Sequence, residues 1–181
     1  MAASLDRSAA ATHAPASLRG RDREWVAISS ALECARSRTS SAVLIEGHAG
    51  AGCSRLLSAV AEVGVAAGFS VASGSASRVT WLAPLTPLLE AIDALPGGPN
   101  SGWAGRLPGE LLDEAAACLK RHAGRKPTVV VLDDLQRADP MLLAALRVLS
   151  VRLRSYPLAW VFARHAGEAG PGADEFVRDL E

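Results

Sequence analysis

Apolar residues recur at two different spacings along the chain, and these spacings predict helices and strands in alternation. Apolar positions three or four residues apart predict helices at 21–36, from 54 up to the glycine at 68, at 88–95, at 109–122 and at 142–153. Short continuous apolar runs predict strands at 41–46, 69–72, 129–132 and 158–163. The chain therefore reads as strands and helices in succession.

The apolar run at 129–132 has no polar interruption, which is typical of a parallel strand buried on both faces. Strands that alternate with helices favour a parallel sheet covered on both sides, with ligands at the carboxyl ends of the strands. We therefore expect an α/β fold, a three-layer sandwich with a mostly parallel sheet. One such domain is expected over 18–181, behind a disordered lead-in at 1–17 with little apolar content. Asp139 is expected to cap a helix that has Pro140 in its first turn.

Composition and charge argue against several classes of protein. The 19 basic and 19 acidic residues cancel, so no broad positive field gathers nucleic acid, and we expect no direct DNA binding by this chain. No apolar run approaches the roughly 18 residues of a membrane span, and no signal segment is recognisable, so a cytoplasmic protein without a membrane partner is expected. The three widely spaced cysteines form no CxxC pair and indicate neither a disulfide framework nor zinc.

Residues 47–54 match the phosphate-loop pattern GxxxxGK[ST] at every fixed position except the lysine, where Cys53 stands. Glycines let backbone amides curl around a phosphate, and the following helix adds unpaired N–H groups and its positive dipole end. Ser54 would hold Mg²⁺ through its hydroxyl. The candidate nucleotide-binding residues are Gly47, His48, Ala49, Gly50, Ala51, Gly52, Cys53, Ser54 and Arg55. Of these, His48 and Arg55 are expected to face solvent, and an ordinary glycine-rich turn is the alternative for the whole segment.

Two aspartates follow the apolar run at 129–132 and form the second candidate element. Asp133 can hold the magnesium shell, and Asp134 can polarise the attacking water, which makes Asp134 a candidate catalytic residue. A buried strand that ends in a polar turn would look the same. Together with the glycine loop, however, the pair favours a P-loop nucleotide-binding fold.

Four segments carry a resemblance to a known family: LRGRDREW at 18–25, LIEGHAGAGCSRLL at 44–57, VVVLDDLQRADP at 129–140 and a strand that ends in Arg164. They resemble the nucleotide-binding domain of the large ATP-binding LuxR-type transcriptional regulators, of the STAND class of signalling ATPases related to AAA+ proteins. The resemblance covers nearly everything after residue 17. It implies a P-loop NTPase fold and, as ligands, ATP or ADP with Mg²⁺.

The resemblance also implies roles for residues outside the glycine loop. In that family the GRxxE element packs near the adenine, so Gly20, Arg21 and Glu24 would line the base pocket. The arginine that ends the later strand senses the γ-phosphate, which makes Arg164 a candidate catalytic residue. Without the resemblance, the first element reads as a capped helix start and the second as a solvated strand end.

Cys53 is the first departure from the family, because it removes the cation that bridges the β and γ phosphates. One charge-assisted contact is worth roughly 1.5 to 3 kcal/mol, so nucleotide affinity should fall about tenfold to a hundredfold and hydrolysis should suffer more. Lys126 lies at the wrong end of its strand to replace the lysine. Rescue by Arg78, Arg137 or Arg164 is not expected. One interpretation is that Cys53 is a redox-sensing thiol. We favour the other, in which position 53 lost its lysine by drift in a domain that no longer turns over.

Length is the second departure, since the resembled regulators continue into a helical sensor region and a DNA-binding helix-turn-helix. A truncated product, a fragment and a stand-alone relic all fit 181 residues. The first functional hypothesis is an ATP- or ADP-binding regulatory module whose bound state governs self-association or partner proteins. The second is a slow Mg-dependent ATPase that uses Asp134 and Arg164. The third is a nucleotide-free interaction or remnant domain.

Overall fold

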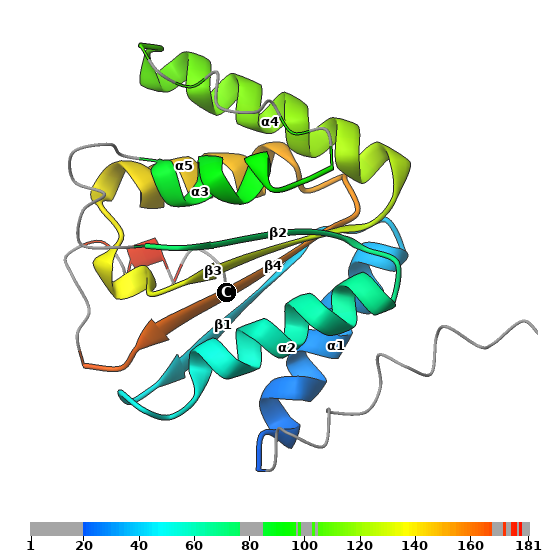
Figure 1. Ribbon diagram of the computed structural model, residues 1–181, viewed down its shortest axis with the longest axis vertical. Coiled ribbons are helices and arrows are strands. Elements are labelled where there is room, and N and C mark those ends of the chain that lie inside the picture. The colour runs from blue at the N-terminus through cyan, green and yellow to red at the C-terminus, as the bar shows by residue number, and fades with distance from the viewer. Residues whose placement is uncertain are drawn as a thin grey trace, which may run out of the picture.

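The computed structural model describes residues 20–76, 85–96, 98, 103, 105–167, 172, 175–176 and 178. The expected lead-in at 1–17 and Arg78 lie outside the described residues. The helices are α1 Asp22–Arg36, α2 Cys53–Ala66, α3 Thr86–Asp93, α4 Pro108–Arg125 and α5 Pro140–Arg152, with a short 3₁₀ helix, η3, at Leu135–Arg137. The strands are β1 Ser41–Gly47, β2 Ser70–Ser75, β3 Thr128–Asp133 and β4 Leu158–His165. The predicted alternation of strands and helices is confirmed (Figure 1).

The four strands form one parallel sheet in the order β1-β4-β3-β2. Strands β1 and β2 are consecutive in the chain but lie at opposite edges of this sheet, and β4 is inserted beside β1 (Figure 1). Parallel neighbours require crossover connections, which the helices provide. The α/β fold with a parallel sheet is therefore confirmed.

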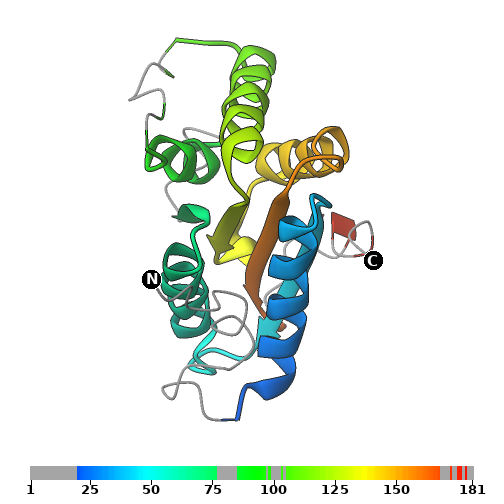
Figure 2. The same ribbon diagram turned by 90° about the vertical axis from the view of Figure 1, so that its right-hand side faces the viewer.

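Helices cover both faces of the sheet, so the molecule has three layers (Figures 1 and 2). One face packs against α1 and α2 in a core, here called the α1/α2 core, that includes Trp25, Leu32, Leu56 and Val60. The other face packs against α3, α4 and α5 in a second core that includes Leu88, Leu119, Leu146 and Leu149. Burial of apolar side chains on both sides of the sheet is the main favourable term that holds these layers together.

Strand β4 shows how the sheet divides its residues between the two cores. Ala159, Val161 and Ala163 belong to the α1/α2 core, whereas Trp160 and Phe162 belong to the other core. Successive side chains of a strand point to opposite faces. The face on which each later residue of β4 lies therefore follows from its position in this alternation.

Local sequence signals explain where α5 begins. Asp139 is its N-cap residue, and the carboxylate accepts hydrogen bonds from the backbone N–H groups of Met141 and Leu142 at 2.8 and 3.0 Å. Pro140 occupies the first turn, where its missing N–H has no partner to lose. The predicted cap is confirmed.

All four strands extend beyond their apolar patterns at the carboxyl end, and β2 and β4 do so the most. β2 begins at Ser70 instead of residue 69 and continues to Ser75, which pairs with Asp133. β4 continues beyond 163 to His165, which pairs with Gly47. Small and polar residues at these strand ends carry no apolar signal, but pairing with the neighbouring strand extends them. As a result, the carboxyl ends of all four strands meet at one edge of the sheet.

Candidate functional site

The glycine loop between β1 and α2 is curled. Gly50 and Gly52 have φ angles of 81° and 83°, in the left-handed region that favours glycine. The backbone N–H of Ala51 donates to the carbonyl of His48 at 2.9 Å, which closes a turn inside the loop. The segment is therefore wrapped rather than extended, as a phosphate-binding loop requires.

The N-terminal end of α2 has no side-chain cap: its N-cap residue is Gly52, and no side chain of the described residues accepts a hydrogen bond there. Ser54 lies in the first turn and is exposed, as are His48 and Arg55. The first N–H groups of a helix need an acceptor, and an anion can provide one. The exposure of His48 and Arg55 agrees with the expectation that both face solvent.

Cys53 is turned inward. Its side chain is buried in the α1/α2 core, with 5% of the residue exposed. Burial raises the pKa of the Cys53 thiol; the nearby Arg21 lowers it, and the carboxylate of Asp133 raises it again. The thiol is therefore protonated at neutral pH. The redox-sensing alternative rested on a thiol pKa lowered by the helix N-terminus, and the net shift has the opposite direction.

Arg21 connects the start of α1 to the glycine loop. Its guanidinium donates one hydrogen bond to the backbone carbonyl of Ala51 and another to the carboxylate of Glu24. The hydrogen bond from Arg21 lowers the pKa of Glu24. Gly20, just before Arg21, has a φ of 78°. The element expected near the adenine thus lies against the loop, and Arg21 places a positive charge beside Cys53, where the family has its lysine. Sequence reasoning did not include Arg21 among the replacement cations.

Asp133 lies on the face of β3 that carries the α1/α2 core, because Val129 and Val131 belong to that core and side chains alternate. Cys53, the first residue of α2, also belongs to the α1/α2 core, so Asp133 and the start of α2 lie on the same face of the sheet. One carboxylate oxygen accepts the backbone N–H of Asp134 at 2.7 Å. Asp133 and the glycine loop therefore share one face and one edge of the sheet, and the magnesium role of Asp133 stays a prediction.

Asp134 has several partners. Its φ of 58° lies in the left-handed region. Its carboxylate accepts hydrogen bonds from the amide of Gln136 at 2.8 Å and the hydroxyl of Ser75 at 3.4 Å, and it lies 3.6 Å from the guanidinium of Arg137. Three side chains therefore hold the carboxylate that is predicted to polarise the attacking water. Arg137, one of the candidate replacement cations, is directed to this carboxylate.

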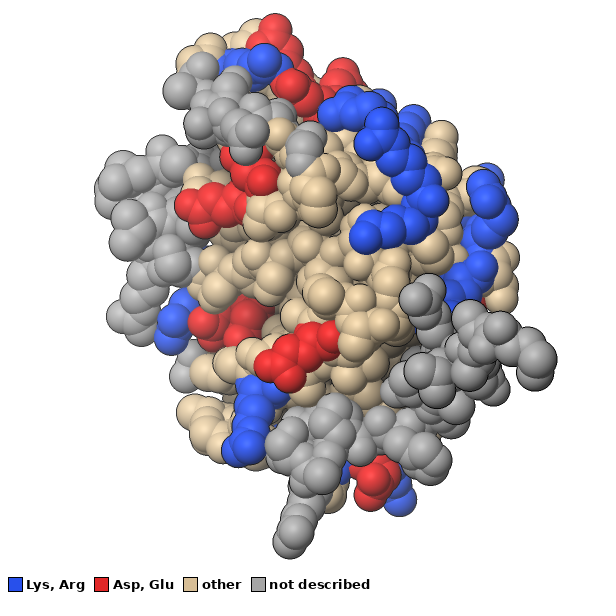
Figure 3. All heavy atoms as spheres, turned by 45° about the vertical axis from the view of Figure 1, so that its right-hand side comes forward, with Lys and Arg blue, Asp and Glu red and all other residues tan. Residues whose placement is uncertain are grey.

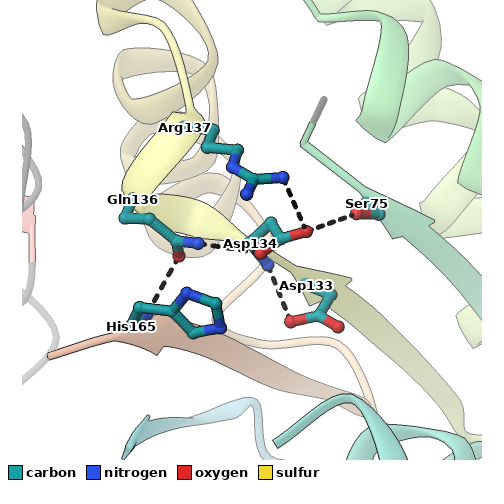
Figure 4. A network of polar contacts seen from close by, with 6 residues as sticks. All are labelled: Ser75, Asp133, Asp134, Gln136, Arg137 and His165. Carbon is teal, nitrogen blue, oxygen red and sulfur yellow. Dashed lines mark hydrogen bonds and ion pairs between the residues drawn. The ribbon is translucent and has the colours of Figure 1, made fainter. Parts of the chain in front are cut away.

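Gln136 connects this carboxylate to β4. Its amide nitrogen donates to Asp134, and its amide oxygen accepts the backbone N–H of His165 at 3.0 Å. The residue is buried, with 8% exposed. Figure 4 shows the resulting network, which joins the carboxyl ends of β2, β3 and β4. Sequence reasoning did not single out Gln136, although its place two residues after the aspartate pair was a usable signal.

Arg164 and His165 lie on opposite faces of β4. Arg164 lies on the same face of β4 as Trp160 and Phe162, opposite the α1/α2 core, because side chains alternate along a strand. Its Nε donates to the carboxylate of Glu46, its register partner on β1, and its side chain is 11% exposed. His165 lies on the α1/α2 face. The predicted role of Arg164 as γ-phosphate sensor is not tested by this pairing and stays a prediction.

Lys126 lies just before β3, at the opposite end of the sheet from Asp133, as expected. On the face shown in Figure 3, basic and acidic side chains are both distributed among uncharged residues. Among the described residues, no helix has the length and apolar content needed to cross a bilayer, and no group of three or more His, Cys, Asp and Glu residues forms a metal site.

Comparison with known proteins adds a family and a fold. Residues 17–161 match the family model described as "AAA ATPase domain". A chain of a solved structure described as "Structure of Drosophila ORC bound to DNA" is similar to this chain with a TM-score of 0.60 and 18% sequence identity. The similarity covers 87% of this chain but only 40% of that chain. No curated protein sequence matches significantly. The structural likeness supports the P-loop NTPase fold.

Proposed function

Because the chain belongs to the AAA ATPase domain family, we propose that it is an ATP- or ADP-binding regulatory module whose bound nucleotide governs its self-association or its contacts with partner proteins. One observation carries the proposal: the curled loop at 47–52 leads into an uncapped helix N-terminus, and Asp133 ends β3 on the same face of the sheet. This combination offers backbone N–H groups to a phosphate and an acidic side chain to a cation.

The residues at this edge fit a magnesium nucleotide. The left-handed φ angles of Gly50 and Gly52 let the backbone turn around an anion. Mg²⁺ prefers oxygen ligands, and the Ser54 hydroxyl with the Asp133 carboxylate would hold it. When bound, the ion would neutralise charge on the phosphate oxygens. Arg21 donates to a loop carbonyl and to Glu24. These contacts hold both residues against the loop, which supports the base pocket that the resemblance implies.

We propose that hydrolysis is impaired. Cys53 supplies no cation, since its thiol is short, buried and protonated. The carboxylate of Asp134, the proposed group for polarising water, is already bonded to Gln136 and Ser75 and is close to Arg137. A slow Mg-dependent ATPase is the second candidate. Arg21 favours it, because its positive charge lies beside the position of the missing lysine.

The finer assignment comes from the resemblance to LuxR-type regulators of the STAND class, carried by LRGRDREW and VVVLDDLQRADP. On this proposal the module regulates transcription through other parts of an assembly rather than by touching DNA itself. Equal numbers of basic and acidic residues support that view. The Drosophila chain belongs to a complex described as bound to DNA, but the similar region covers only 40% of that chain.

A titration with a fluorescent ATP analogue, with and without Mg²⁺, tests the proposal. Magnesium-dependent binding by the wild type is expected, and Cys53→Lys should tighten it about tenfold to a hundredfold. Ser58→Lys is the matched control, because it adds the same charge on the exposed side of α2 one turn further along. Steady release of phosphate from ATP by the wild type would instead support the slow ATPase. No binding by the wild type, restored by Cys53→Lys, would overturn the proposal in favour of a remnant domain.

A further inference from the structure

Two cavities lie at the amino-terminal ends of the strands, the edge of the sheet opposite the glycine loop. Lys126 and Pro127 precede β3, and Pro157 precedes β4. Backbone hydrogen bonds hold these segments side by side: the N–H of Ser70 donates to the carbonyl of Pro127, and the N–H of Thr128 donates to that of Pro157, both at 2.9 Å. The proposed nucleotide site is at the carboxyl ends of the strands, so it gives no role to the side chains here.

The two cavities share Arg125 and Lys126 in their linings. The first cavity, of about 250 Å³, is lined by Ser70, Pro96, His122 and these two residues. The second cavity, of about 170 Å³, is lined by the same two residues with Arg36, Arg38 and uncharged neighbours. Among the described residues, no aspartate or glutamate lines either cavity. Both cavities are therefore surrounded by positive charge and hydrogen-bond donors.

His122 is a buried side chain of the first cavity. Only 8% of the residue is exposed, and its imidazole has no hydrogen-bond partner in the described part of the chain. Burial lowers the pKa of His122, and the charges of Arg121, Arg125 and Lys126 lower it further. The ring is therefore neutral at neutral pH and has one N–H donor. Because a buried donor without an acceptor is costly, an acceptor in this cavity would be stabilising.

Ser70 shows the same feature in a different element. The residue is 2% exposed, and its hydroxyl has no hydrogen-bond partner within the described ranges. Buried polar groups are nearly always bonded to protein, water or an ion. Ser70 begins β2, whereas His122 lies in the last turn of α4. Two separate elements thus bring unpartnered polar side chains to one cavity.

The basic side chains around the cavities are mostly unpaired. Arg38, Arg125 and Lys126 are exposed and form no ion pair with any described residue, whereas Arg36 lies 3.6 Å from the carboxylate of Glu33. Basic residues in the last turn of a helix complement its dipole, but this effect is modest and does not explain why the ends of α1 and α4 place their charges at one cavity. An anion between these charges would remove their mutual repulsion.

We infer that the two cavities form a binding site for a small molecule that carries two phosphate groups. Phosphate oxygens accept hydrogen bonds from imidazole, ammonium and guanidinium groups. One phosphate group enters the first cavity, where His122 donates to it, and the other meets Arg38 in the second cavity. Arg125 and Lys126 line both cavities and contact both groups. Because His122 is recessed in a cavity of about 250 Å³, the ligand is a small molecule rather than a nucleic acid.

A titration with pyrophosphate, without Mg²⁺ and at constant ionic strength, tests the inference by NMR of the histidine ring signals. The signals of His122 should shift and reach saturation. They should do so at about tenfold lower concentration than with inorganic phosphate, because the second phosphate group adds a charge-assisted contact. His48 lies in the glycine loop, so its signals report separately on anions bound there. His48→Gln and His122→Gln assign the two sets of signals.

Substitutions of the basic residues test the two halves of the site. Arg125→Gln and Lys126→Gln should each weaken pyrophosphate binding at His122 about tenfold. Arg38→Gln should weaken binding of pyrophosphate but not of inorganic phosphate, which needs only the first cavity. Arg23→Gln is the matched control, since it removes the same charge from an exposed position of α1, and thermal melting checks that each variant is folded. Unshifted His122 signals, or equal losses in Arg125→Gln and Arg23→Gln, would overturn the inference.

Two further measurements identify the source of the phosphate groups. Vesicles that contain phosphatidic acid and a short single-stranded oligonucleotide should each bind the wild type and Arg125→Gln equally weakly. Binding of either one that depends on Arg125 would overturn the assignment to a small molecule. All these outcomes are separate from the proposed function, because the nucleotide site lies at the other edge of the sheet and is reported by His48.

Discussion

The sulfur of Cys53 lies against Gly47: a Cβ added to the glycine would come within 2.7 Å of Sγ, and within 3.1 Å of the Cβ of Ala51. The first residue of α2 thus packs onto the last residue of β1, across the loop that joins them. A side chain at position 47 and the thiol at position 53 compete for the same space. The curled shape of the loop therefore depends on a glycine at its start.

Gly47→Ala should destabilise the protein by about 1 to 3 kcal/mol, because an added methyl group overpacks this contact. Cys53→Ala in the same chain should recover part of the loss, since it removes the closer of the two contacts. Urea unfolding of the two single variants and the double variant measures this coupling. Gly109→Ala is the control: nothing lies within 4 Å of its added Cβ, so stability should be unchanged or slightly higher. A Gly47→Ala variant as stable as wild type would contradict the packing described here.

Cys53 should react slowly with iodoacetamide at neutral pH. Burial raises the pKa of its thiol, and the thiolate is the reacting form. Its labelling rate should rise only as pH increases toward that raised pKa. Mass spectrometry of the labelled cysteines can compare it with Cys34, which is only partly buried and should react first. Labelling in denaturant, where access is equal, is the control. Equal rates for Cys34 and Cys53 in the folded protein would revive the redox-sensing alternative.

Arg21→Ala should weaken nucleotide binding about tenfold, because the loop loses a hydrogen bond from a charged donor. The effect should be smaller in a Cys53→Lys background, where the lysine restores a cation at the loop. Affinities of the two single variants and the double variant form a double-mutant cycle. Arg23→Ala, at an exposed position of α1, is the matched control. An equal loss in both backgrounds would mean that Arg21 acts only on the shape of the loop.

His122 should make stability depend on pH in the mildly acidic range. Its burial in α4, with the charges of Arg121, Arg125 and Lys126, lowers its pKa. The unfolded chain then binds a proton at higher pH than the folded one, so stability is lost as pH falls from the usual histidine range, about 6.5, toward the lowered value. Melting temperatures measured across this range should fall less steeply for His122→Gln. His48→Gln, at an exposed position, should keep the slope of the wild type.

Much of this protein can be read from residue order alone, because the signals involved are local. The loop at 47–54 is contiguous, so its glycines and Ser54 stand out without any knowledge of the fold. Asp133 comes directly after the apolar run of a buried parallel strand, and such strands end at a common edge. The cap at Asp139 is equally local. These features depend on short-range spacing, which a sequence displays directly.

Other features depend on strand order and register, which bring distant residues together. Gln136 bonds to His165 only because β3 and β4 are neighbours, and Arg21 meets Ala51 only because α1 packs beside the loop. Which of Arg164 and His165 lies on the same face as the loop depends on the register of β4. A shift of one residue in register moves every side chain of a strand to the opposite face. The apolar run at 158–163 carries no polar landmark that specifies this register, whereas pairing of β4 with β1 and packing of its residues into two cores specify it.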